Sequence, residues 1–573
     1  MARFDTIIKD GMIIDGTRVP RYRGDIGIKD GRVACIGRLS EHEAERVLDA
    51  SDCIVAPGFV DLHTHYDAQV FWDPYCTLSG WHGVTSAVIG NCGFGFAPVQ
   101  PEMRERMMLS MTRVEAIPFD SMKAGLPWDW VTYPEFLQSL DRTPKGINLL
   151  PYVPMGPLLV WVLGLQDAKD GRNPTPEEMA EIKRLLHEAM DAGACGWSAQ
   201  RLPATGGIAN QRDYDGTPMP TDNMSDATTI ELARVLAERN EGFIQMTYAS
   251  GDPKHDGAHF AELAEVSGRP ILYNVLQSND FYPHRHRNTI KWLEEMRERG
   301  LRVYGQALTT AAGFTFTFED WNLFDDSDAW AEATTGTLEE RKAKLADPAR
   351  RERLRTEVST GVTGPMENIV VLKCGNPELK KYHDLFLGEI AEREGKHAVD
   401  VMLDIAVADD LKAMFFAESF SNSLELLREV VTYPYSIYGV SDGGAHTKFL
   451  TAGRYPTETI IRYARDNDII SLEEAHWRLS AFPAFCAGFS DRGTLRQGAP
   501  ADLVIYNLDQ LGITDMEVVH DLPGGEWRRI QRAVGYRYIM VNGEVTFVDG
   551  KETGATPGLV LRHGGANVTS DQA

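Results

Sequence analysis

Two histidines separated by a single residue follow a short apolar stretch near the start of the chain. His63 and His65 stand at the end of Pro57-Gly58-Phe59-Val60-Asp61-Leu62-His63-Thr64-His65. Side chains alternate along a strand, so residues two apart point the same way. If this strand belongs to a parallel barrel, both imidazoles lie at its carboxyl end and can reach one metal ion. The motif therefore predicts a metal site.

Cys92 and Asp442 are the residues that could complete such a site. Cys92 stands in Gly90-Asn91-Cys92-Gly93-Phe94, and Asp442 in Val440-Ser441-Asp442-Gly443. A thiolate is a good zinc ligand, and the metal itself lowers the pKa of the thiol. A carboxylate beside a metal-bound water can take its proton and pass it to a leaving nitrogen. The alternatives are that Cys92 is a small buried hydrophobe and that Asp442 is a turn residue.

The middle of the chain must position these side chains. Short apolar segments there alternate with amphipathic helices, as in the helix that begins at Thr175-Pro176-Glu177-Glu178, a capping box. Such alternation predicts parallel strand–helix units. Eight strands are expected near residues 58, 85, 148, 195, 244, 271, 302 and 437. Two further candidates near residues 369 and 412 leave the strand count open.

Both ends of the chain are rich in hairpin signals. Asp10-Gly11 and Asp30-Gly31 near the start, and Asn542-Gly543 and Asp549-Gly550 near the end, separate short apolar runs. We therefore predict one small β domain built from both termini. The expected divisions are residues 1–57 plus 487–555 for this domain, 58–486 for the barrel, an insertion about 310–365 that could form a lid, and a tail 556–573.

Composition excludes several classes of function. The chain has 573 residues and a net charge of −25, which disfavours binding to nucleic acid. The seven cysteines are an odd number and are scattered, so they do not form a disulfide framework. No charge-free apolar stretch is long enough to span a membrane, and the residues Met1-Ala2-Arg3-Phe4-Asp5 lack the apolar core expected of a signal peptide. We expect a cytoplasmic enzyme that does not bind membranes and that could form a homo-oligomer.

Several motifs together resemble the amidohydrolase superfamily, the metal-dependent hydrolases that include urease, hydantoinases and dihydroorotase. Within it, the chain is similar to the D-aminoacylase, or N-acyl-D-amino-acid deacylase, group. The resemblance rests on the His-x-His segment and on Gly83-Val84-Thr85, Gly90-Asn91-Cys92-Gly93-Phe94, Ala97-Pro98, Gly193-Ala194-Cys195-Gly196-Trp197-Ser198, Val440-Ser441-Asp442-Gly443 and Arg492-Gly493-Thr494-Leu495. It implies the α/β class, with a (β/α)8 TIM-like barrel and a small β-sandwich made by both termini.

The resemblance also implies roles for individual residues. His63 and His65 match the metal ligands that follow the first strand, and Cys92 matches a cysteine ligand. Asp442 matches the aspartate of the last strand, which contacts the metal and acts as general acid and base. The implied reaction is hydrolysis of an amide C–N bond in an N-acyl amino acid or similar small molecule.

The chain departs from the family at the histidines of the fifth and sixth strands. Tyr248 and Val275 align there, and Met155 aligns with a third histidine after the third strand. No histidine occurs from residue 188 to residue 254. We therefore expect about one tightly bound divalent metal per chain, most simply zinc, with Tyr248 free to donate a hydrogen bond to a developing oxyanion.

Two alternatives to this mononuclear site stay open. Nearby histidines could replace the missing ligands: His255, His259, His284, His286 and His446. The chain could instead be a catalytically silent, oligomeric barrel. Among enzymes, a mononuclear hydrolase of a lactone, a cyclic amide or an acyl C–C bond is the other candidate.

A further group of basic side chains could bind the substrate. His446, Lys448 and Arg454 follow Asp442 closely, and cations there could hold a substrate carboxylate. His284 and His286 form a second His-x-His between arginines, which favours an anion-binding loop over a metal site. We predict that all five contribute to substrate binding.

Overall fold

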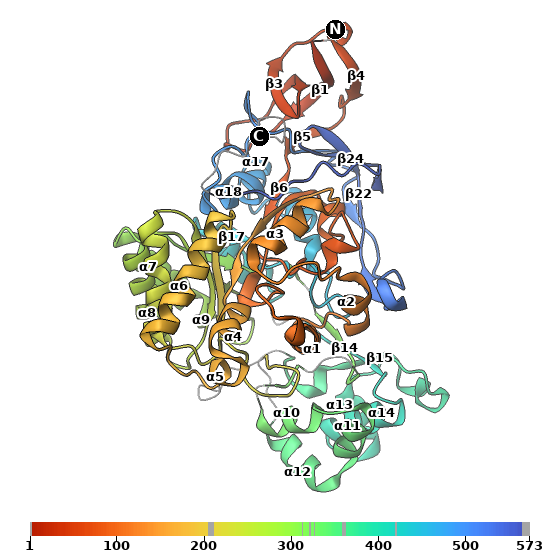
Figure 1. The fold of residues 1–573 in the computed structure, drawn as a ribbon. Coiled ribbons are helices and arrows are strands. Elements are labelled where there is room, and N and C mark those ends of the chain that lie inside the picture. The colour runs from red at the N-terminus through yellow and green to blue at the C-terminus, as the bar shows by residue number, and fades with distance from the viewer. Residues whose placement is uncertain are drawn as a thin grey trace.

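The protein is described by a computed structural model that covers residues 3–203, 211–311, 313–319, 323–325, 327–357, 363–418 and 421–563. Figure 1 shows three parts. A β domain that carries the N-terminus lies at the top, a ring of strands and helices lies in the middle, and a mainly helical lobe lies at the bottom. The ring positions the candidate metal ligands.

Eight parallel strand positions form the barrel, as the sequence predicts. The strands are β6 (Phe59–Asp61), β7 (Val84–Ile89), β8 (Asn148–Pro151) continued by β9 (Val153–Pro154), β10 (Gly196–Arg201), β11 (Phe243–Tyr248), β12 (Ile271–Leu276), β13 (Val303–Ala307) and β17 (Ser436–Tyr438). Hydrogen bonding links β6, β7 and β8 in one run, and β9 to β13 and then β17 in another. A parallel bridge between Thr64 and Gly443 joins the loops that follow β6 and β17, and so closes the ring.

Helices cover the outside of the barrel. They are α1 (Arg104–Val114), α2 (Phe119–Gly125), α3 (Tyr133–Arg142), α4 (Met155–Leu163), α5 (Leu165–Lys169), α6 (Pro176–Asp191), α7 (Asp226–Arg239), α8 (Pro253–Ser267), α9 (His284–Glu298), α15 (Leu424–Thr432), α16 (Tyr455–Glu458), α17 (Leu472–His476) and α18 (Phe482–Cys486). Helix α6 begins as predicted, because Thr175 Oγ1 accepts from Glu178 N and the Glu178 carboxylate accepts from Thr175 N. Its buried face includes Ile182 and Leu186.

The β domain is built from both ends of the chain. Its strands are β1 (Phe4–Ile13), β2 (Tyr22–Lys29), β3 (Arg32–Gly37), β4 (Ala44–Asp49), β5 (Ile54–Pro57), β18 (Leu503–Tyr506), β23 (Tyr536–Val541), β24 (Glu544–Val548) and β25 (Lys551–Glu552). Strand β18 pairs antiparallel with both β5 and β23, which joins the N-terminal strands to the C-terminal ones. Shorter strands extend this end of the chain: β19 (Gly512–Ile513), β20 (Glu517–Val519), β21 (Arg528–Ile530) and β22 (Ala533–Val534).

The lobe at the bottom of Figure 1 has its own small sheet and core. It consists of β14 (Phe314–Phe316), β15 (Val370–Lys373) and β16 (Met414–Ala417), with α10 (Asp328–Thr334), α11 (Leu338–Ala346), α12 (Pro348–Thr356), α13 (Leu387–Glu394) and α14 (Ala398–Ala408). The strands near 369 and 412 therefore pair antiparallel in this lobe and add nothing to the barrel. The lobe continues past residue 365, the end of the predicted insertion, because β16 returns to pair with β14.

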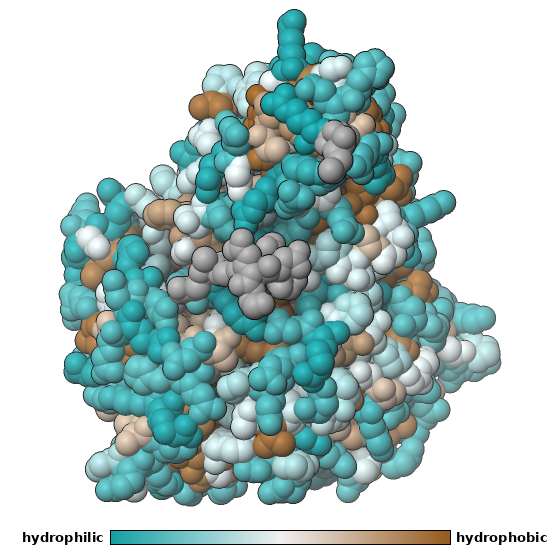
Figure 2. Space-filling view, turned by 45° about the horizontal axis from the view of Figure 1, so that its top comes forward, coloured by the Kyte–Doolittle hydropathy of each residue, from teal (hydrophilic) through white to brown (hydrophobic). Residues whose placement is uncertain are grey.

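The surface is mainly hydrophilic on the face that Figure 2 shows, with hydrophobic residues scattered between hydrophilic ones. Within the described residues, no helix is both long and apolar enough to cross a membrane. All seven cysteines are unpaired, in agreement with the prediction that they form no disulfide framework.

Candidate metal centre

His63 and His65 follow β6 directly, at the carboxyl end of the barrel. Each is only 1% exposed. Their Nε2 atoms face the same carboxylate, because Asp442 Oδ1 lies 3.3 Å from His63 Nε2 and 3.7 Å from His65 Nε2. The two histidines predicted from the His-x-His spacing and the aspartate after β17 thus come together across the closure of the barrel.

Cys92 joins this group from the turn after β7. Its backbone has a φ of 57°, in the left-handed region, and its N–H donates to Gln245 Oε1 at 2.8 Å. This turn directs Sγ toward His63, 3.5 Å from Nε2. The ligand atoms of His63, His65 and Cys92 all lie within 4.8 Å of one another, and all three residues are buried.

The spacing of these atoms suits a metal ion. A tetrahedral ion with ligand bonds of about 2.0–2.3 Å separates neighbouring ligand atoms by roughly 3.3–3.8 Å. The distances from His63 Nε2 to Cys92 Sγ and to Asp442 Oδ1 are 3.5 and 3.3 Å, and that from His65 Nε2 to Asp442 Oδ1 is 3.7 Å. The donor set of two imidazoles, a thiol and a carboxylate is one that zinc accepts.

The neighbours of His63 leave its Nε2 ready to bind. Gln306, on β13, donates from Nε2 to the carbonyl of Leu62 at 2.9 Å, which fixes the orientation of its amide. Its Oε1 therefore faces His63 Nδ1 at 3.1 Å and accepts a hydrogen bond from that atom. A proton on Nδ1 leaves the lone pair of Nε2 directed at the metal position.

Burial disfavours the charged forms of the two imidazoles and of the thiol. Desolvation lowers the pKa of His63 and takes that of His65 well below its ordinary value, so both imidazoles are neutral at pH 7. Burial, with the nearby carboxyls of Glu115 and Asp442, raises the pKa of the Cys92 thiol well above its ordinary value. A divalent cation would reverse the effect on Cys92, because it stabilises the thiolate.

The loop after β17 is tied to the loop after β6. His65 N donates to Gly443 O at 2.6 Å, and Ser441 Oγ donates to His63 O at 2.9 Å. Asp442 lies between these two hydrogen bonds. Its φ of 47° is in the left-handed region, which a non-glycine residue adopts only when the surrounding structure imposes it. Its side chain is 25% exposed, so its carboxylate faces both the donors and solvent.

The side chains of β11 and β12 that face Cys92 are each one position along the strand from the residues that the sequence predicts. Gln245 and Thr247 face the site, since Gln245 contacts the Cys92 backbone and Thr247 Oγ1 lies 3.7 Å from Cys92 Sγ. Asn274 donates to Thr247 Oγ1 at 2.8 Å from the next strand. Because side chains alternate along a strand, Tyr248 and Val275 lie on the opposite faces of their strands.

The structure therefore corrects the placement of Tyr248. Its hydroxyl lies 3.2 Å from His255 Nε2, and its ring is covered by the guanidinium of Arg201 at 4.2 Å. His255 and Arg201 also contact Asp226 of α7, at 3.1 and 2.8 Å. Tyr248 thus belongs to a polar cluster between the barrel and its helices, and its hydroxyl does not face Cys92.

Two of the predicted substrate residues lie elsewhere on the barrel. His284 and His286 are on α9, and His286 Nε2 lies 3.0 Å from Glu429 Oε2 of α15. Arg287 binds the same carboxylate at 2.6 Å. His286 and Arg287 therefore join α9 to α15, and no contact in the described residues links His284 or His286 to the metal donors.

Arg454 is also held by protein groups. Its Nε lies 3.1 Å from Glu458 Oε2, and its Nη1 donates to Thr451 Oγ1 at 2.8 Å. The remaining Nη2 donates to the carbonyl of Ala311. These three bonds fix the loop after Asp442 onto the start of the lobe.

Glu115 is a residue of the site that the sequence did not reveal. It follows α1, its Oε1 lies 3.6 Å from His65 Nε2, and its Oε2 lies 3.2 Å from His446 Nε2. Burial raises the pKa of the Glu115 carboxyl to about 7, although His446 opposes this. The segment Arg113-Val114-Glu115-Ala116 carries no motif, so only the fold shows that Glu115 lies beside the donors.

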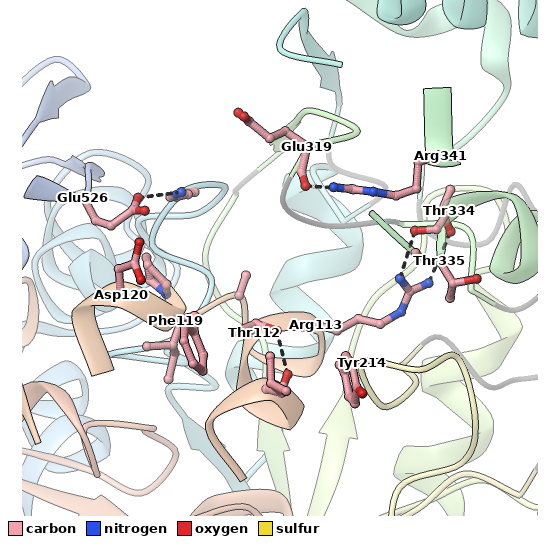
Figure 3. Close-up of a pocket in the computed structure, with 16 residues that line it drawn as sticks. Thr112, Arg113, Phe119, Asp120, Tyr214, Glu319, Thr334, Thr335, Arg341 and Glu526 are labelled. Atoms are coloured by element: carbon pink, nitrogen blue, oxygen red, sulfur yellow. Dashed lines mark hydrogen bonds and ion pairs between the residues drawn. The ribbon is translucent and has the colours of Figure 1, made fainter. Parts of the chain in front are cut away.

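A cavity of about 430 Å³ lies between the barrel and the lobe. Figure 3 shows the Arg113 side chain reaching Thr334, to which its guanidinium donates, with Thr335 beside them and Arg341 near Glu319. Arg113 and Ala116, which flank Glu115, line it, as does Lys448, whose Nζ lies 3.0 Å from Glu526 Oε2. The metal donors are not among the residues that line the cavity, but Glu115 lies beside His65 and within the segment that lines the cavity, so the cavity wall adjoins the donors.

Comparison with known proteins places the chain in a family. The Amidohydrolase family matches residues 46–351 and 385–547. An uncharacterized protein of Mycobacterium bovis is 28% identical over 88% of this chain and 84% of its own length. An N-acyl-D-glutamate deacylase of Alcaligenes xylosoxydans xylosoxydans is 26% identical over 98% of this chain and 97% of its own length.

Solved structures share the fold. The N-acyl-D-glutamate deacylase of Bordetella bronchiseptica, complexed with zinc and a phosphonate inhibitor, superposes with a TM-score of 0.67 at 24% identity, over 98% of this chain and 100% of that chain. The full-length match in fold agrees with a barrel and a terminal β-sandwich in one unit. This chain belongs to the Amidohydrolase family.

Proposed function

We propose that this protein is a metal-dependent hydrolase that cleaves the amide C–N bond of an N-acyl amino acid or a similar small molecule. The observation that carries the proposal is the spacing of four buried or half-buried donors, His63, His65, Cys92 and Asp442, at the separations of tetrahedral zinc ligands. The deacylases among the relatives support the amide as the bond that is cleaved.

These four residues would hold the metal. When bound there, a divalent ion polarises a carbonyl and lowers the pKa of a water molecule. Asp442 is placed to take the proton of the attacking water, because its carboxylate reaches both the donors and solvent. The same carboxyl then passes the proton to the leaving nitrogen.

We further propose one zinc per chain. Strands β11 and β12 offer only Gln245, Thr247 and Asn274 toward Cys92, and neutral amides and hydroxyls bind zinc far more weakly than imidazoles do. A second ion would have few strong ligands on that side.

The cavity beside the lobe is the proposed route and binding space for the substrate. Lys448 lines it from the loop that carries Asp442, and we propose that its ammonium group holds the substrate's carboxylate in exchange for Glu526. Replacement of Lys448 by Gln is expected to raise KM for acidic substrates with little change in kcat.

The unpaired cysteines are consistent with a cytoplasmic enzyme.

Metal analysis combined with a substrate panel tests the proposal. Purified, unchelated protein should hold about one zinc per chain, and the double variant His63→Ala, His65→Ala should hold none while keeping its circular dichroism spectrum. His187→Ala, on the exposed side of α6, is the matched control. N-acyl-D- and N-acyl-L-amino acids, lactones and cyclic amides should be assayed together. A wild-type metal content in the double variant, or hydrolysis that withstands complete metal removal, would overturn the proposal.

A further inference from the structure

Glu115 is not among the predicted ligands, yet its buried carboxylate lies beside the metal position. Only 1% of its surface is exposed. Its Oε1 lies 3.6 Å from His65 Nε2, close to the 3.7 Å that separates Asp442 Oδ1 from the same atom. The two carboxylates therefore lie at nearly the same distance from Nε2 of His65.

The ring nitrogen of His65 that Glu115 approaches shows whether Glu115 orients the histidine or binds the metal beside it. A carboxylate or amide that merely orients a ligand histidine binds the ring nitrogen that faces away from the metal. Gln306 does so for His63, at Nδ1. Glu115 instead lies beside Nε2, the nitrogen that also faces Asp442. Its position is that of a ligand.

We propose that Glu115 is a further ligand of the metal. Its carboxylate supplies a strong anionic donor, which strands β11 and β12 do not offer. The inference rests on the proposed function, since it concerns the same ion. The added carboxylate expands the tetrahedral set of four donors to five, namely two imidazoles, one thiolate and two carboxylates. Such a buried anion is stabilised only if a cation or hydrogen-bond donors lie beside it.

His446 positions this carboxylate. Its Nε2 lies 3.2 Å from Glu115 Oε2, and its backbone N–H donates to Glu115 O at 2.7 Å. The residue has a φ of 50°, in the left-handed region that a non-glycine residue adopts only under constraint. Two bonds between the same two residues hold Oε1 toward His65, so His446 acts through Glu115.

Zinc affinity and the cobalt spectrum of the full-length protein test this assignment. Zinc binding is measured by competition with a chromophoric chelator, and Co²⁺ is substituted to record its d–d absorption, which reports coordination number. Glu115→Gln should lose at least about tenfold in zinc affinity and change the cobalt spectrum. Glu474→Gln is the matched control, because it removes a partly buried carboxylate of α17 that pairs with Arg478. It should change neither.

The outcomes separate this inference from the proposed function. A wild-type protein that binds no zinc would overturn both. Zinc bound by the wild-type protein, with the same affinity and cobalt spectrum in Glu115→Gln, would overturn the role of Glu115 alone. If Glu115→Gln does not fold, Glu115→Asp, which retracts the carboxylate by one methylene, replaces it. An unchanged spectrum in that variant would equally contradict the assignment.

Discussion

Gln306 Oε1 lies 3.1 Å from His63 Nδ1, and the same amide donates to the carbonyl of Leu62 at 2.9 Å. This pair of bonds joins β13 to the end of β6 and selects the tautomer of His63 whose Nε2 carries the lone pair. The amide therefore contributes to the metal site without touching the metal position.

Replacement of Gln306 by Ala should weaken zinc binding by roughly 10- to 100-fold, because His63 loses the partner that fixes its tautomer and ring orientation. Chelator competition measures the change, and circular dichroism checks the fold. Gln166→Ala, which removes an exposed amide on α5, is the control and should bind zinc as the wild-type protein does. An unchanged affinity in Gln306→Ala would show that His63 is held by packing alone.

Cys92 should set the metal preference. The change Cys92→Ala removes the single soft donor, so zinc affinity should fall and the preference should move toward harder ions such as Mn²⁺. Competition titrations with Zn²⁺ and Mn²⁺ measure both effects. Cys195→Ala controls for loss of a core thiol, because Cys195 is buried just before β10 in a different hydrophobic cluster from Cys92. Equal metal affinities in Cys92→Ala and the wild-type protein would favour the alternative that Cys92 is only a small hydrophobe.

The neighbours Thr247 and Tyr248 should respond differently to removal of their hydroxyls. Thr247 Oγ1 already accepts from Asn274, so its own proton is available to Cys92 Sγ at 3.7 Å. Thr247→Val should therefore weaken zinc binding several-fold, since the thiolate loses a donor. Tyr248→Phe removes a hydroxyl that faces His255 and should leave zinc affinity and turnover close to wild type. A loss of turnover in Tyr248→Phe with metal retained would restore its role as an oxyanion donor.

His82 should make the protein sensitive to acid. Burial lowers the pKa of His82 to about 4, against an ordinary value of 6.5, and both ring nitrogens are hydrogen-bonded, to Thr457 and to the carbonyl of Gln531. The unfolded chain thus binds a proton at His82 at a higher pH than the folded chain does. The stabilisation is complete above pH 6.5 and declines as the pH falls toward 4, by roughly 2–3 kcal/mol between pH 7 and pH 4.5.

Melting temperatures at pH 7 and pH 4.5 test this expectation. The fall between the two should be smaller in His82→Gln than in the wild-type protein, because glutamine does not titrate. His187→Gln, on the surface of α6, should fall as far as the wild type. An equal fall in all three proteins would assign the acid sensitivity to other groups.

The barrel and its main donors could be predicted from the sequence because their signals are local. Apolar runs of strand length, helix caps such as Thr175, and a His-x-His pair at a strand end depend on neighbours in the chain. The eight strand positions and the joining of both termini in one sheet followed from such patterns. The apposition of His63 with Asp442 also followed, since parallel strands in a barrel bring their carboxyl ends to one edge.

The tertiary structure alone decided which side chains of β11 and β12 face the donors. A displacement of one residue along a strand moves a side chain to the other face, and the residues that face Cys92 are Thr247 and Asn274, each one position before the predicted Tyr248 and Val275. The tertiary structure also places Glu115 and Gln306 beside the metal donors, although both lie in segments without a motif. Their proximity to His65 and His63 arises from closure of the barrel and packing of the loop after α1, which are contacts between residues far apart in the chain.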